Sequence, residues 1–70
     1  MRYAVIVEQA QSNFSAYVPD FPYCATTGKT IAEIQQNIRE AIQFHLEGLR
    51  ENGLPTPEPS AIVEYCEFAA

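Results

Sequence analysis

Basic residues are scarce in this sequence, and the few that occur are scattered. Only 4 of the 70 residues are lysine or arginine, against 9 aspartates and glutamates, so the formal net charge is −5 at pH 7. Binding to nucleic-acid phosphates requires clustered basic side chains, which this chain lacks. The composition therefore argues against direct nucleic-acid binding and suits a basic protein partner.

Long hydrophobic runs and a dense cysteine pattern are also missing. The apolar run near the amino terminus, Ala4 to Val7, is too short for a signal-peptide core or a membrane span. Cys24 and Cys66 form no C-x-x-C motif, so we expect a cytoplasmic protein in a reducing compartment. The sequence does not decide whether these two cysteines form a disulfide.

The strongest local signal is a helix between Thr30 and Gly53. Thr30 can act as the N-cap, and Glu33 can complete a capping box by accepting the Thr30 N–H. Gly53 tolerates the left-handed conformation of a helix end, and Pro55 prevents continuation. One face of this helix is apolar and needs a sheet to pack against. That face consists of Ile31, Ile34, Ile38, Ala41, Ile42, His45, Leu46 and Leu49.

Four segments have the composition of strands: residues 2–8, 14–18, 23–27 and 61–68. The prolines in 54–59 predict a stiff extended linker before the last strand. The expected fold is α+β with the order βββαβ. Three strands form an antiparallel meander, the fourth runs parallel to the first, and the long helix packs on one face.

A single helix leaves the opposite face of the sheet uncovered. We place Tyr3, Tyr17 and Tyr65 or their neighbours on that face, because contiguous exposed aromatic surface usually marks an interaction site. Small domains also often gain stability by self-association. We therefore predict a homo-oligomer, dimer or tetramer, or a partner bound at this face.

Residues with catalytic potential are few. Gly28-Lys29-Thr30 matches the end of a phosphate-binding loop, but that motif needs glycine at the position of Tyr23, so a turn and N-cap are favoured. His45 is the only histidine, and we expect it to be partly buried with one hydrogen-bond partner, because no second histidine is available for a metal.

The carboxylates Glu8, Asp20 and Glu64 offer an alternative, a minimal metal-dependent nuclease, because hard divalent cations prefer oxygen ligands. The favoured interpretation is that Glu8 and Glu64 are solvated and that Asp20 is a turn residue bonded to its own backbone. Asn37 is expected to pair with loop backbone. Phe44 either packs under the linker or belongs to a contact surface.

Taken together, these residues resemble the HicB-type antitoxins. The pattern F-x-A-x-V-P-D-x-P-x-C covers residues 14–24, with Tyr23 where the family commonly has glycine. G-x-T-x-x-E from Gly28, then Asn37, E-A at 40–41 and G-x-P-x-P-x-P at 53–59 follow in order. The resemblance implies a truncated RNase H-like fold that lacks the working carboxylates of the nuclease.

The resemblance also implies function. HicB-type proteins neutralise small basic HicA-type toxins, which cleave messenger RNA, by covering the active surface of the toxin. We expect a non-enzymatic single domain over residues 1–70, without the C-terminal DNA-binding domain of many members, and without cofactor or metal. A nuclease and a small-ligand-binding oligomer are the alternatives. The residues predicted to contact a partner are Tyr3, Tyr17, Asp20, Phe21, Tyr23, Phe44 and Tyr65.

Overall fold

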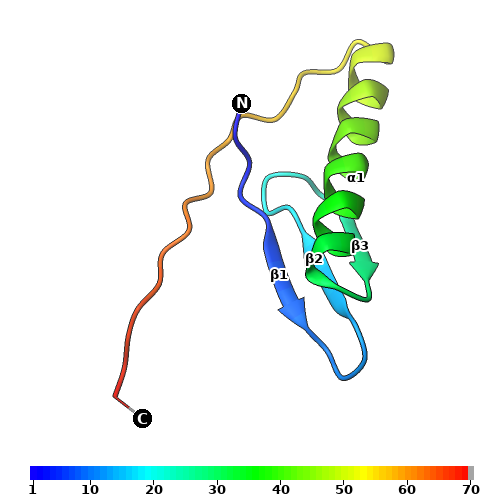
Figure 1. The fold of residues 1–70 in the computed structure, drawn as a ribbon. Helices are drawn as coiled ribbons and strands as arrows, with labels where there is room; N and C mark the ends of the chain where they lie inside the picture. Colours follow the sequence, from blue (N-terminus) through cyan, green and yellow to red (C-terminus); the bar gives the residue numbers. More distant parts are fainter. Residues whose placement is uncertain (70) are drawn as a thin grey trace.

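The computed structural model describes residues 1–69, in which three short strands and one long helix form two layers (Figure 1). Strands β1 (Ile6–Gln9), β2 (Phe14–Tyr17) and β3 (Ala25–Gly28) precede helix α1 (Ile31–Glu51). The sheet is antiparallel with the order β1-β2-β3. The three-stranded meander and the long helix on one face confirm this part of the predicted α+β fold.

The register of the strand pairs decides which side chains meet the helix. Val7 is paired with Ala16, and Ile6 with Tyr17, which is paired in turn with Ala25. Directly paired residues project from the same face of a sheet. Ala16 is buried, so its row faces α1, whereas the row of Ile6, Tyr17 and Ala25 faces away from the helix.

The core lies between β2, the loop that follows it, and the first half of α1. Gly28 at the end of β3 allows close approach of the helix, because a Cβ there would lie 2.9 Å from the backbone nitrogen of Ile34. Asn37 secures the same contact: its Nδ2 donates to the carbonyl of Thr27 at 2.9 Å, so its partner is the backbone of strand β3 instead of the predicted loop backbone. The buried residues are Ala16, Val18, Phe21, Cys24, Ile34 and Ile38.

Helix α1 begins and ends close to the predicted residues. The Thr30 hydroxyl accepts the N–H of Glu33 at 3.0 Å, as predicted for the N-cap. The Glu33 carboxylate, however, accepts the N–H of Lys29 at 3.2 Å instead of the predicted N–H of Thr30. At the other end Gly53 has φ of 66° and donates its N–H to the Arg50 carbonyl at 3.2 Å.

Strand β1 is shorter than predicted, because it begins at Ile6 instead of Arg2. Its partner β2 ends at Tyr17, opposite Ile6, and Pro19 follows soon after. Proline has no N–H to donate to a strand ladder, so the pairing cannot continue toward the amino terminus.

The C-terminal segment differs most from the predicted fold. Residues 54–69 form neither helix nor strand, so the fourth strand expected at 61–68 is not in the described sheet. Residues 61–69 instead leave the domain as an extended segment, here called the C-terminal arm (Figure 1). Hydrogen bonds at Ser60 and Ala61, described below, fix its starting point. No helix in residues 1–69 has the length and apolar character needed to cross a membrane.

Candidate partner-binding surfaces

Asp20 joins the loop after β2 to the start of the C-terminal arm. Its carboxylate accepts the Ser60 hydroxyl at 2.8 Å, the Ser60 N–H at 3.3 Å and the Ala61 N–H at 3.4 Å. The hydrogen bond from the Ser60 side chain, followed by the two backbone N–H groups, lowers the pKa of Asp20. The prediction that Asp20 bonds its own turn is wrong, because its partners begin 40 residues later. We call Ser60 and Ala61 the arm root.

Tyr3, Phe21 and His45 pack together beside the arm root. The ring centroids of Tyr3 and Phe21 are 4.5 Å apart, and those of Phe21 and His45 are 5.1 Å apart. The Tyr3 hydroxyl donates to the Pro57 carbonyl at 2.7 Å. The pKa of Tyr3 is raised, chiefly by desolvation and then by the negative charges of Glu58 and Asp20.

This packing changes the expected position of two predicted contact residues. Tyr3 does not share the open sheet face with Tyr17; it packs on the core on the helix side of the sheet. Phe21 is only 2% exposed, so it supports the surrounding surface without contributing area of its own. His45 is partly buried, as predicted, but no hydrogen-bond partner of its ring is found among residues 1–69; the ring packs against Phe21 instead.

The remaining predicted contact residues are exposed aromatic side chains on four different parts of the chain. Tyr17 lies on β2, Tyr23 in the loop before β3, Phe44 on α1 and Tyr65 on the C-terminal arm. The proposed common face of Tyr3, Tyr17 and Tyr65 is therefore not present, because only Tyr17 of these three projects from the open face of the sheet.

Tyr23 stands out for its backbone. Its φ is 65°, in the left-handed region that L-residues other than glycine rarely adopt, and its side chain is fully exposed. The loop around it is closed by hydrogen bonds from the Val18 N–H to the Cys24 carbonyl at 3.1 Å and from the Cys24 N–H to the Phe21 carbonyl at 3.4 Å. The tight turn thus forms with tyrosine, at the expense of backbone strain.

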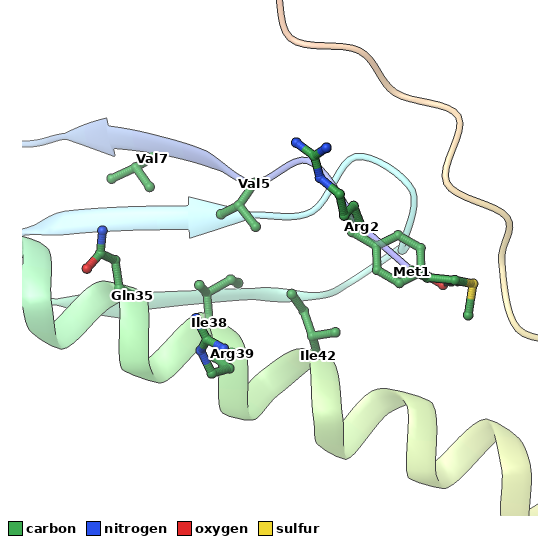
Figure 2. A pocket seen from close by; sticks show the side chains of 9 residues that line it. Met1, Arg2, Val5, Val7, Gln35, Ile38, Arg39 and Ile42 are labelled. Atoms are coloured by element: carbon green, nitrogen blue, oxygen red, sulfur yellow. Dashed lines mark hydrogen bonds between the residues drawn. The ribbon is translucent and has the colours of Figure 1, made fainter.

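An open groove lies between β1 and α1 (Figure 2). Helix α1 packs against β3 and β2 but not against β1, which leaves the helix side of β1 uncovered. Val5 and Val7 line one side of the groove, and Ile38 and Ile42 line the other (Figure 2). Its volume is about 680 Å³, and Arg2 and Arg39 lie among its other lining residues.

The sequence matches a family model along almost its full length. The model describes the HicB_like antitoxin of bacterial toxin–antitoxin systems and matches residues 3–69. The chain belongs to the HicB-like antitoxin family. The HicB-like sequence pattern noted above therefore reflects true membership of the family.

Individual relatives agree with this assignment. The HicB-like chain is 35% identical over 65 residues to a 14.9 kDa protein from the rep–hol intergenic region of Haemophilus phage HP1, covering 93% of this chain and 49% of the phage protein. It thus spans about half of that relative. It is 36% identical over 62 residues to a UPF0150 protein of Thermoplasma acidophilum, covering 87% of this chain and 90% of the relative.

A solved structure is similar in three dimensions. One chain of a HicA3 and HicB3 toxin–antitoxin complex matches with a TM-score of 0.71 and 33% identity, covering 84% of this chain and 70% of that chain. The fold described above is therefore one that also occurs in a toxin–antitoxin complex.

The three carboxylates of the nuclease alternative are not assembled in this HicB-like chain. Glu8 lies on β1, Glu64 lies on the C-terminal arm outside the sheet, and Asp20 is engaged by the arm root. Within residues 1–69, no three His, Cys, Asp or Glu side chains are grouped closely enough to hold a metal ion. The geometry therefore gives no support to a nuclease centre built from these residues.

The two cysteines are free thiols in different surroundings. Cys24 is buried in the core, and burial raises the pKa of its thiol. Cys66 lies exposed on the arm. Only Cys66 is therefore placed to react readily with reagents from solution.

Proposed function

We propose that this protein is a non-enzymatic antitoxin that acts in the cytoplasm by covering the active surface of a small, basic, mRNA-cleaving toxin of the HicA type. The observation that supports this most directly is the similarity to a chain of a HicA3 and HicB3 toxin–antitoxin complex, at 33% identity. Membership of the HicB-like antitoxin family supports the same role.

The charge of the chain fits a basic partner. The net charge is −5 at pH 7. Exposed glutamates lie on α1 at Glu33, Glu40 and Glu47, and others follow in the linker and the arm. Complementary charge raises the association rate and disfavours wrong partners more than it adds affinity. We therefore expect toxin binding to slow as the salt concentration increases.

Exposed aromatic residues provide the apolar part of the proposed contact. Tyrosine is frequent among the few interface residues that dominate binding energy. Tyr23 is fully exposed and held in a strained conformation, which is understandable if its ring serves a partner. Phe44, 79% exposed, lies in a second shallow apolar hollow with Leu49 and Leu54.

Affinity purification from the native cell tests the proposal. The tagged full chain should recover a small basic protein that cleaves RNA. Tyr23→Ala and Phe44→Ala should each weaken the complex by at least about 30-fold, the equivalent of about 2 kcal/mol for a dominant interface residue. Gln43→Ala is the matched control, since Gln43 is an exposed polar neighbour of Phe44 on α1.

The same preparation separates the proposal from its main alternative. The purified chain alone is incubated with RNA in Mg²⁺ or Mn²⁺. RNA cleavage by the wild-type chain that disappears in Glu8→Gln would contradict a non-enzymatic role and favour a metal-dependent nuclease.

A further inference from the structure

The layer of helix on the sheet is incomplete over β1. Helix α1 packs on β3 and β2, so the helix side of β1 has no cover within residues 1–69. Val7 on this side is 42% exposed, and Val5, just before the strand, is only partly buried. In two-layer domains, the apolar face of a sheet is buried against another element. The groove between β1 and α1 is therefore an open place in the helix layer (Figure 2).

The width of this open place fits one helix. Neighbouring strands lie about 4.8 Å apart, so β1 lies about 10 Å from β3 across the sheet. Packed helices lie about 8–10 Å apart, measured between their axes. A second helix beside α1 would therefore lie over β1. Val5 and Val7 would lie beneath it, and Ile38 and Ile42 of α1 would lie at its side.

The charge around the groove is opposite to that of the whole chain. The net charge is −5, but Arg2 and Arg39 line the groove, and no acidic residue of the described part does so. Arg2 lies on the β1 side and Arg39 on the α1 side (Figure 2). An adjoining hollow on α1 shares Arg39 and Ile42 and adds Arg50, with Glu47 as its one acidic residue. Three of the four basic residues of the chain thus border these two hollows, which we call the basic strip.

The spread of these charges decides between possible occupants. Arginines stand on both sides of the groove, and Arg50 follows about 16 Å along α1 from Arg39, since eleven helical positions separate them. The single anionic group of a small amphiphile could meet only one of these sites. A helix with an apolar stripe and acidic residues on its flanks meets all three. A basic toxin would be repelled by the basic strip, so the occupant is a partner separate from the proposed toxin.

We propose that the basic strip binds an acidic amphipathic helix of a second protein, which lies beside α1 and completes the helix layer over β1. Within residues 1–69, α1 is the only helix, so the second helix comes from another molecule. Its apolar stripe covers the four aliphatic residues of the groove, and its carboxylates pair with the three guanidinium groups. This contact goes beyond the antitoxin role and does not depend on it.

A synthetic peptide serves as the probe for the basic strip. It is a fluorescein-labelled helix of about 14 residues, about 21 Å long, with leucine at i, i+3, i+4 and i+7 and glutamate on both flanks. A charge-reversed twin has lysine in place of each glutamate. In fluorescence anisotropy with the full chain, the acidic peptide should bind at least about 10-fold more tightly than its twin, and more weakly as salt increases. Equal affinities would overturn the proposal. No toxin is present, so the result is independent of the proposed function.

Two charge variants locate the binding site. Arg39→Glu should weaken binding of the acidic peptide at least about 10-fold and improve binding of the basic twin, because the charge beside the groove is reversed. Lys29→Glu is the matched control: it makes the same change in net charge at an exposed residue that does not line either hollow. It should change the affinity less than about 2-fold. Both residues are exposed, so the helix signal in circular dichroism should stay unchanged. Equal weakening by the two variants would contradict binding at the basic strip.

Two further variants test the apolar contact on opposite faces of the sheet. Val7 and Tyr17 are 42% and 43% exposed, respectively. Val7→Ser should weaken peptide binding at least about 5-fold, whereas Tyr17→Ser should leave it unchanged; equal effects would refute the placement over β1. A second copy of this chain is the other possible occupant. Light scattering well above the 7.8 kDa monomer mass, with amide signals of Val5 and Val7 that do not respond to the peptide, would assign the groove to that copy and overturn the proposal.

Discussion

Replacement of Tyr23 by glycine should stabilise the domain. Tyr23 has φ of 65° and a fully exposed side chain, so glycine relieves the backbone without removing buried surface. The left-handed region costs about 1–2 kcal/mol for an L-residue, and glycine loses about 0.5–1 kcal/mol of extra conformational freedom on folding. The free energy of unfolding should therefore rise by about 0.5–1 kcal/mol, which raises Tm by about 2–8 °C in a domain of this size.

Thermal unfolding followed by circular dichroism measures this change, with all variants compared at one fixed protein concentration. Tyr23→Ala is the control: it keeps a Cβ and most of the strain, so its Tm should stay close to that of the wild type. If Tyr23→Gly melts at or below the wild-type temperature, the argument from backbone strain fails. If Tyr23 contacts the toxin, the stabilised glycine variant should also inhibit the toxin less well.

Three other perturbations have defined outcomes. The pKa of Asp20 is lowered in the folded state, so its hydrogen bonds to the arm root should persist above the usual carboxyl pKa of 3.8 and be lost as the pH falls through the folded-state pKa. The amide chemical shifts of Ser60 and Ala61 measure this loss. Asp20→Asn should give the same detached arm root already at pH 7. Ile34→Ala should lower the free energy of unfolding, measured by chemical denaturation, by about 2–5 kcal/mol, because the Ile34 side chain is fully buried. Ile31 is half exposed on the same helix, so Ile31→Ala should lower it far less. Equal decreases for the two variants would contradict the described core. Gly48→Ala should add up to about 1 kcal/mol, because the new methyl group enters open space on the helix; Gly28→Ala should instead lower Tm, because its Cβ would meet the Ile34 backbone at 2.9 Å.

Local signals in the sequence were sufficient to predict the helix and the meander. The caps of α1 depend on residues a few positions apart, such as Thr30 with Glu33, and these contacts form almost as predicted. Asn37 likewise bonds the backbone of a neighbouring element. Such features follow from side-chain chemistry and short loops, which the sequence shows directly.

Features that depend on distant pairing could not be predicted from the sequence. Asp20 bonds an arm root 40 residues away, and nothing near it in the sequence indicates that partner. The strand predicted at 61–68 is absent from the described sheet, because composition does not say whether an edge is available within the same chain.

The sequence prediction put Tyr3, one of the candidate contact residues, on the wrong face of the sheet. Side chains alternate between the two faces of a strand, so Tyr3 projects to the same face as Val5 and Val7. This face is the one turned toward the helix. The alternation could therefore have placed Tyr3 correctly. The sequence does not indicate that Arg2 and Arg39 line the same groove, because they come together only where the amino-terminal segment lies beside α1.

The most direct test of the antitoxin role is a titration of RNA cleavage. The small basic protein recovered with this chain is assayed on RNA while the purified full chain is added in increasing amounts. The account predicts that cleavage falls to background as the chain approaches stoichiometric amounts, and that high salt slows the onset of inhibition. Unchanged cleavage in the presence of a large excess of folded chain would contradict the proposed function.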